Sequence, residues 1–168
     1  MKAVLLEAPP ISGTYPEQWY RAKGECTFAL FEDAESEEWL GVFGNGGITQ
    51  YSAAISFPTT ACVLVIARGK GYAVDIQTKQ LRYEAQCDYL VNAVEVPARD
   101  LIVACDFTRL YAFSSEKQLW QSDNIASDGI ELGEVSESYV RGKVWQYDQW
   151  LPFTLKVDEL SIELGKVK

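Results

Sequence analysis

The chain contains no histidine. Without an imidazole it cannot form a Ser-His-Asp or Cys-His catalytic pair, or a zinc site that uses histidine ligands. Its cysteines include no C-x-x-C pair, which argues against a structural zinc, and most of them lie in or beside apolar runs where a thiol packs as a small hydrophobe. They are Cys26, Cys62, Cys87 and Cys105. We therefore expect reduced core cysteines, no metal and no cofactor, and the sequence favours a non-catalytic protein over an enzyme.

The chain also lacks the signals of helices and of membrane segments. No window keeps an apolar period of about 3.6 residues for roughly three turns, so the sequence does not predict an amphipathic helix. Residues 1–10 contain one lysine and a short apolar stretch that Glu7 interrupts. This stretch is too short for a signal peptide or a membrane span, so we expect a cytoplasmic location and no membrane partner.

Acidic residues outnumber basic ones by 24 to 15, which gives a formal net charge of −9. This charge repels the phosphate backbone, so we do not expect a nucleic-acid partner. It would attract a basic protein, although it would also simply keep the chain soluble. Apolar residues make up 48% of the 168 residues, which excludes a disordered chain and predicts one domain over residues 1–168.

Two segments about forty residues apart are alike, and a repeat at this period is typical of stacked β-meanders, the unit of propeller blades. Residues 71–81 and 110–120 each predict a strand, a polar turn and a second strand, and each follows an apolar run, at 62–67 and 101–105. We count roughly thirteen short strands, enough for about three blades where a closed propeller needs roughly four. The sequence therefore predicts an all-β fold of antiparallel meanders in a partial or modified β-propeller-like array, with a two-sheet β-sandwich as the alternative. A dimer through strand edges would protect the remaining edges.

The first third of the chain gives weaker signals. Residues 7–22 carry three prolines and are predicted to form an irregular N-terminal arm or loop, because proline fixes φ and lacks a donor. Residues 44–47, Gly-Asn-Gly-Gly, predict a turn, since glycine and asparagine tolerate positive φ. Residues 48–57 are interpreted as a strand.

The second copy of the repeat resembles the β-propeller repeat of quinoprotein dehydrogenases and of the outer-membrane assembly lipoprotein. In that repeat a Tyr-Ala-Asp strand runs through a Thr-Gly-Lys turn into a strand that ends in tryptophan. Residues 110–114 and 117–120, LYAFS and KQLW, are similar, with Ser114 in place of the aspartate. The first copy has Tyr72 to Asp75 and Thr78-Lys79, lacks the turn glycine and has Arg82 in place of the tryptophan. The resemblance covers residues about 60–121 and implies that tyrosine and tryptophan pack between neighbouring sheets; it carries over no activity.

Two kinds of candidate site remain. Asp106, Arg109 and Asp128 lie at strand ends and are candidate ligand-binding residues, because carboxylates in a cleft between sheets can serve an enzyme or a small-ligand binder. Aspartates of this kind are also common in surface turns.

The second kind is a partner-binding surface. Residues 32–38 hold five acids, and residues 123–137 hold a second acidic stretch without lysine or arginine. Exposed tryptophans beside such charges would suit protein binding, because tryptophan is enriched at hot spots and charge speeds the encounter. If Trp39, Trp145 and Trp150 are instead buried between sheets, they only support the fold. The candidate partner-binding residues are Trp39, Glu37, Glu38, Glu131 and Glu134.

The function that we expect is that of a soluble, non-catalytic binding protein, in particular an acidic immunity or inhibitor protein for a basic partner. The alternative is a carboxylate-based enzyme or small-ligand binder. A purely structural assembly module is a third possibility.

Overall fold

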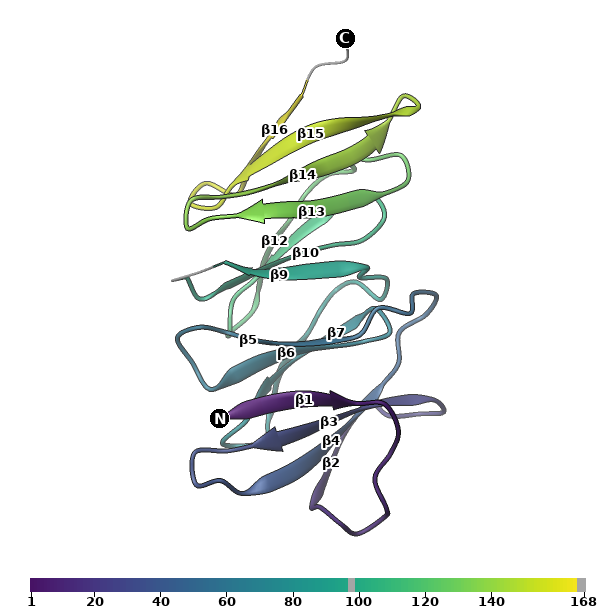
Figure 1. Ribbon diagram of the computed structural model, residues 1–168, viewed down its shortest axis with the longest axis vertical. Coiled ribbons are helices and arrows are strands. Elements are labelled where there is room, and N and C mark those ends of the chain that lie inside the picture. Colours follow the sequence, from purple (N-terminus) through teal and green to yellow (C-terminus); the bar gives the residue numbers. More distant parts are fainter. Residues whose placement is uncertain (97–98, 166–168) are drawn as a thin grey trace.

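The computed structural model describes residues 1–96 and 99–165 and contains four sheets of four strands, stacked one on the next (Figure 1). We number the sheets in chain order. The strands of the first and second sheets are β1 (Lys2–Leu6), β2 (Glu17–Tyr20), β3 (Cys26–Glu32), β4 (Glu38–Gly44), β5 (Ala53–Ser56), β6 (Cys62–Ala67), β7 (Lys70–Asp75) and β8 (Leu81–Glu84). Those of the third and fourth are β9 (Asn92–Val96), β10 (Leu101–Cys105), β11 (Leu110–Phe113), β12 (Gln118–Gln121), β13 (Ile130–Val135), β14 (Tyr139–Gln146), β15 (Gln149–Lys156) and β16 (Ser161–Leu164).

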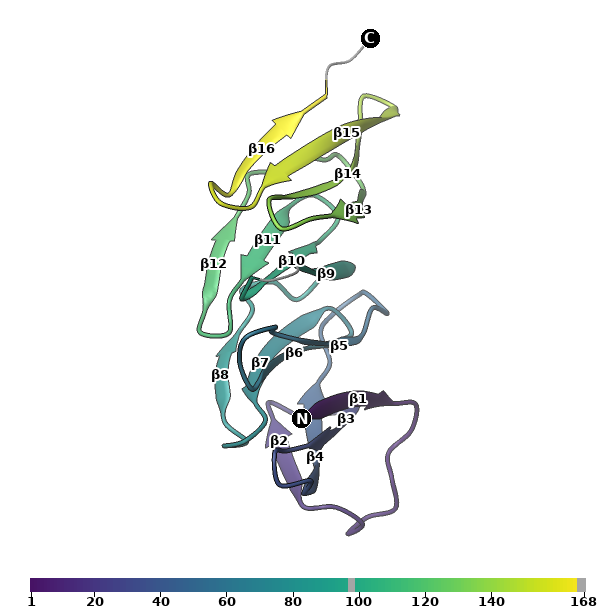
Figure 2. The same cartoon turned by 60° about the vertical axis from the view of Figure 1, so that its left-hand side comes forward.

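The second, third and fourth sheets are antiparallel meanders whose strands follow chain order. The first sheet has the order β1-β3-β4-β2, with β2 parallel to β4. The leading strands β1, β5, β9 and β13 contact one another in succession, as the inner strands of propeller blades do. The first and fourth sheets lie at opposite ends of the stack, so the array is open (Figure 2). Within the described residues no helix is long and apolar enough to cross a membrane.

The fold is thus all-β and propeller-like, as the repeat predicts. It has four sheets, and not the two of the alternative β-sandwich. Three apolar layers hold the sheets together, one between each pair of neighbours. In β6, Val63 and Val65 face the first sheet while Leu64 and Ile66 face the third. Because both faces of the inner sheets are buried, their central strands are continuous apolar runs rather than alternating ones. This is why the runs at 62–67 and 101–105 stand out in the sequence.

The repeated tyrosines pack between sheets, as the resemblance to propeller repeats implies. Tyr72 lies in the layer between the first and second sheets, and Tyr111 lies in the layer between the second and third. The Tyr72 hydroxyl donates a hydrogen bond of 2.7 Å to the Gly44 carbonyl, which ties its sheet to the preceding one. The tyrosines of the two copies therefore have the same role, packing between sheets in neighbouring layers of the stack.

Three local predictions differ from the structure. The arm predicted at 7–22 contains strand β2, which pairs with β4 at the outer edge of the first sheet. The strand predicted at 48–57 is formed only at β5, because the preceding residues link the first sheet to the second. Residues 44–47 do not form a tight turn of positive φ: among the described glycines, only Gly13, Gly24, Gly69 and Gly129 have positive φ.

Glycine is required at position 46 because the backbone there passes very close to other chain segments. The Gly46 amide donates to the Ala67 carbonyl at 2.8 Å. A Cβ added at Gly46 would lie 2.5 Å from the Arg68 carbonyl oxygen and 2.7 Å from that of Asp88. Both atoms belong to backbone, which cannot move aside as a flexible side chain can.

We expect Gly46→Ala to lower the free energy of unfolding by about 2 kcal/mol or more, because overpacking against backbone costs this much. Urea unfolding followed by tryptophan fluorescence measures the loss. Gly47→Ala is the matched control, since its added Cβ would meet only the Tyr89 ring, at 3.3 Å. Equal losses in the two variants would show that close backbone approach is not what position 46 requires.

Candidate functional site

The segments that connect one sheet to the next emerge at the same edge of the stack, at the right of Figure 1. We call this edge the linker edge. It comprises the connections at residues 45–52, 85–91 and 122–129 and the turns at 68–69, 106–109 and 147–148. Backbone hydrogen bonds join these segments: the Gly47 amide donates to the Asp88 carbonyl at 3.3 Å, and the Gly129 amide donates to the Phe107 carbonyl at 2.7 Å. The linker edge is therefore a continuous surface built from several sheets.

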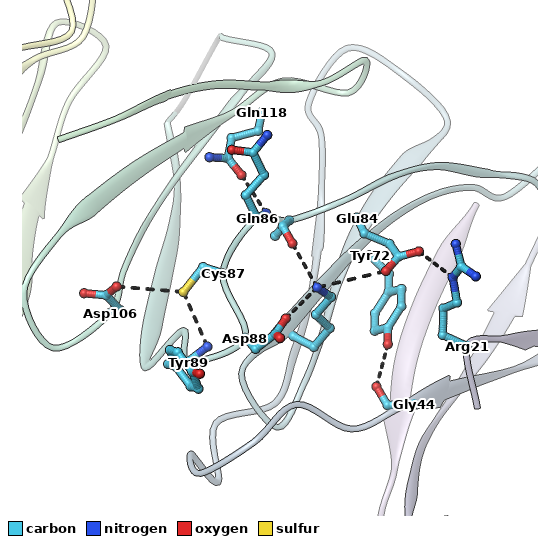
Figure 3. Close-up of polar contacts among 12 residues, drawn as sticks. Arg21, Gly44, Tyr72, Glu84, Gln86, Cys87, Asp88, Tyr89, Asp106 and Gln118 are labelled. Carbon is cyan, nitrogen blue, oxygen red and sulfur yellow. Dashed lines mark hydrogen bonds and ion pairs between the residues drawn. The ribbon is translucent and has the colours of Figure 1, made fainter. Parts of the chain in front are cut away.

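Ion pairs fix the middle of the linker edge (Figure 3). Lys70 pairs with the Asp88 carboxylate, and its ammonium group also donates to the Ala85 carbonyl at 3.1 Å. Arg21 pairs with Glu84 at 2.8 Å, and Glu84 lies 4.0 Å from Lys70. Each of these cations has a carboxylate partner. The network therefore holds the connection at 85–91 against the first two sheets and leaves little net charge there.

Asp106 closes the turn at 106–109 and is buried. Its Oδ1 accepts hydrogen bonds from the backbone amides of Thr108 at 2.6 Å and Arg109 at 2.7 Å. Its Oδ2 accepts a hydrogen bond of 2.6 Å from the Tyr111 hydroxyl. Both oxygens are thus occupied by groups of the protein itself, and Asp106 fixes the backbone from which Phe107 projects.

The thiol of Cys87 lies beside this carboxylate, 3.8 Å from Asp106 Oδ2 (Figure 3). Burial raises the pKa of Cys87, and it also raises the pKa of Tyr111. Both groups are therefore protonated at neutral pH. Since the thiolate is the reactive form of cysteine, Cys87 has the properties of a core residue and not those of a nucleophile.

Three exposed aromatic side chains lie at the linker edge of the third and fourth sheets. Phe107 is 39% exposed, Trp150 is 41% exposed and Tyr147 is 76% exposed. Gly129, bonded to the Phe107 carbonyl, packs so closely on Trp150 that an added Cβ would lie 3.3 Å from the indole. Trp145 meets Trp150 edge to face at 5.5 Å. Trp145 and Trp150 therefore form a ring pair that Gly129 joins to the turn carrying Phe107, and Tyr147 lies at the tip of the same hairpin.

Exposed carboxylates lie on the same segments of the linker edge as these rings. Asp123 and Asp128 lie in the connection at 122–129, and Asp148 lies in the turn between β14 and β15. Within the described residues these three form no ion pair, and the nearby Arg109 directs its Nε to Asn124 Oδ1 at 2.7 Å. We call this cluster the aromatic–acidic patch. Its members are Phe107, Tyr147, Trp150, Asp123, Asp128 and Asp148.

The structure brings the three candidate ligand-binding residues to the same corner of the linker edge. Asp106 and Arg109 share one turn, and Asp128 precedes Gly129, which is bonded to that turn. Only Asp128 is an exposed carboxylate; Asp106 is buried and its oxygens accept internal hydrogen bonds. The three residues remain candidates for ligand binding, but they differ in exposure. Of the two carboxylates, only that of Asp128 is accessible to a ligand.

The candidate partner-binding residues do not share a surface. Glu37 and Glu38 lie at the β3–β4 hairpin of the first sheet, whereas Glu131 and Glu134 lie on β13 of the fourth, at the other end of the stack. Trp39 has no exposed surface, so the expectation that it contacts a partner is corrected. It faces the layer between the first two sheets, because its β4 neighbours alternate between that layer and the outer face.

Sequence reasoning missed Phe107, Tyr147 and Asp148. The sequence offers Trp145 and Trp150 as candidate surface residues, and the structure shows Trp150 exposed and Trp145 half-buried. The signal that could have found Tyr147 and Asp148 is the symmetric segment Trp-Gln-Tyr-Asp-Gln-Trp at 145–150. Its centre is a tight turn between two paired strands, and a bulky aromatic residue is unusual there.

A second polar site lies at the opposite edge, between the second and third sheets. A cavity of about 160 Å³ there is lined by Cys62, Asp75, Arg82 and Ser115, among others. Arg82 pairs with Asp75, and burial raises the pKa of Cys62 to about 12. The Arg82 guanidinium is therefore paired and the Cys62 thiol is protonated at neutral pH, so this thiol is not an activated nucleophile.

No protein family model matches the chain, and no curated protein is similar to it in sequence. Among the described residues, no three cysteine, aspartate or glutamate side chains are placed to hold a metal ion. The function must therefore be argued from the surfaces of the molecule, and the aromatic–acidic patch is the most distinctive of these.

Proposed function

We propose that this protein is a non-catalytic binding protein whose aromatic–acidic patch holds a basic segment of another protein. One observation carries the proposal: exposed Phe107, Tyr147 and Trp150 share the linker edge of the third and fourth sheets with three exposed carboxylates, which form no ion pair within the described residues. Aromatic side chains supply much of the energy at interfaces, and their faces attract lysine and arginine. The carboxylates select a partner of positive charge and speed its encounter with the patch.

The patch stands on a rigid support, which favours binding. Phe107 projects from the turn that Asp106 closes, and Trp150 is the second residue of β15, which pairs along its whole length with β14. Side chains that are already ordered lose little conformational entropy when a partner arrives. The support thus favours a surface that binds without rearranging.

The role that fits this chemistry is inhibition of a basic protein, such as a nuclease or a toxin that binds nucleic acid. Carboxylates can occupy the positions that phosphates take in a basic groove, and the net charge of −9 favours the approach of the whole molecule. We infer that the protein acts in the cytoplasm, where its four free cysteines stay reduced.

The test measures binding of a fluorescent peptide of alternating lysine and arginine by anisotropy, at low salt. We expect Trp150→Ala/Asp128→Asn to weaken binding at least about tenfold, because it removes a hot-spot ring and a charge. The matched control is Leu119→Ala/Glu116→Gln, which removes one exposed apolar and one exposed acidic side chain at the opposite edge. We expect the control to bind as the wild type does.

Two results would count against the proposal. If the wild type does not bind the peptide at low salt, the patch has no affinity for basic segments. If Glu131→Gln/Glu134→Gln loses binding while Trp150→Ala/Asp128→Asn keeps it, the binding surface is the outer face of the fourth sheet instead.

A further inference from the structure

The tip of the β14–β15 hairpin has a backbone conformation that its residues rarely adopt. The strands pair in register up to Gln146 and Gln149, which leaves Tyr147 and Asp148 as a two-residue turn. Their φ angles are 50° and 57°. Such a turn needs positive φ at both positions and usually contains Asn-Gly or Asp-Gly. A tyrosine in this region is a strained choice.

Nothing in the packing of the core explains this choice. The Tyr147 side chain is 76% exposed. The β14–β15 hairpin that carries it ends at the upper right of Figure 1. An asparagine at position 147 and a glycine at position 148 would form the same turn with less strain. Strained residues that packing does not require are concentrated at binding and catalytic sites. We therefore look for the reason for a tyrosine at this position in a molecule that its ring and the neighbouring Asp148 carboxylate could contact.

The same sheet shows how a tyrosine and a carboxylate hold an arginine. The guanidinium carbon of Arg141 lies 4.1 Å from the ring centroid of Tyr139. The same guanidinium donates a hydrogen bond of 3.0 Å to Glu134, and the Tyr139 hydroxyl donates one of 2.9 Å. These hydrogen bonds lower the pKa of Glu134. A ring and an acid side by side thus bind a guanidinium by its face and by its edge at once.

We propose that the hairpin tip is the specificity element of the aromatic–acidic patch and recognises an arginine side chain of the partner. The Tyr147 ring stacks on the guanidinium, and the Asp148 carboxylate accepts its N–H groups. Arginine is preferred over lysine because its planar, weakly hydrated group stacks on a ring and pairs with a carboxylate in two places. This inference rests on the proposed function, since it names the side chain that the proposed surface selects.

The experiment compares two fluorescent peptides that differ only in carrying arginine or lysine at every basic position. We expect the wild type to bind the arginine peptide about tenfold more tightly, the size of a well-formed cation–π contact with an ion pair. We expect Tyr147→Asn/Asp148→Gly to bind both peptides weakly and equally, through the remaining carboxylates. Its urea midpoint should equal or exceed that of the wild type, because Asn-Gly suits the turn.

Each other outcome has a definite meaning. If the wild type binds both peptides equally, the tip does not select arginine, and the proposed function still stands. If the folded wild type binds neither, the proposed function itself fails. If the double variant keeps the preference for arginine, selection lies elsewhere in the patch. A lower urea midpoint of the variant would mean that Tyr147 stabilises the turn, and the strain would no longer support the inference.

Discussion

Replacing Trp39 with alanine should lower the free energy of unfolding by about 3–5 kcal/mol, the range for removing a buried aromatic ring. Trp39 is fully buried between the first and second sheets, and its ring stacks on Phe31 with centroids 4.2 Å apart. The residues around it belong to hydrogen-bonded strands, which cannot move far into the space that the ring leaves. Urea unfolding, followed by far-ultraviolet circular dichroism, measures the loss.

Trp39→Phe separates the packing of the ring from the cost of its indole nitrogen. Nε1 of Trp39 is buried and has no hydrogen-bond partner among the described residues, which is unfavourable for a polar group. Phenylalanine keeps most of the ring and removes this donor, so we expect a loss below about 2 kcal/mol. A loss as large as that of Trp39→Ala would show that the N–H contributes a bond after all. Because Trp39 has no exposed surface, Trp39→Phe should bind basic peptides as the wild type does.

The sequence could predict the inner sheets because their chemistry is local. The apolar runs at 62–67 and 101–105 are buried on both faces, so every residue in them is apolar or small. Strand β2 could not be found this way. It is short and mostly exposed, and it pairs in parallel with β4, which follows only after the intervening strand β3. Its pairing depends on the position of β4, which no local pattern in residues 7–22 specifies.

The candidate site was only partly predictable for a related reason. Trp39 and Trp150 both occur in strands of an end sheet, but one points into the stack and the other points out at its edge. Which face of a strand is buried follows from its register. The sequence alone does not show which face of an end sheet the neighbouring sheet covers. Phe107 was missed because a phenylalanine next to a buried strand usually belongs to the core. Its exposure follows from the turn that Asp106 closes.

The stack separates stability from recognition. Its three apolar layers bury both faces of the inner sheets, whereas the connections at the linker edge carry exposed side chains as well as buried ones such as Leu90 and Ile125. Substitutions of the exposed side chains at this edge can therefore change what the surface binds at little cost to the fold. Asp106 lies at the linker edge and is buried, so its replacement is expected to affect the fold as well. It joins the two functions by fixing the turn that presents Phe107.

Replacing Asp106 with alanine should therefore lower the free energy of unfolding by about 3–4 kcal/mol. The variant leaves the amides of Thr108 and Arg109 and the hydroxyl of Tyr111 without their common acceptor. Each hydrogen bond to a charged group contributes about 1.5–3 kcal/mol, and buried donors left unpaired add to the cost. Urea unfolding measures the loss, and the anisotropy of the basic peptide measures whether Phe107 is still presented.

Two milder variants decide between a structural role for Asp106 and a direct role in ligand binding. Asp106→Asn keeps an oxygen for the two amides, and Tyr111→Phe removes a single donor, so each should cost about 1–2 kcal/mol. Both keep the turn and should leave peptide binding within about twofold of the wild type. A stable Asp106→Asn protein that no longer binds the peptide would show instead that the buried carboxylate acts on the ligand directly. In that case the ligand site would be centred on the turn at 106–109, and not on the exposed rings beside it.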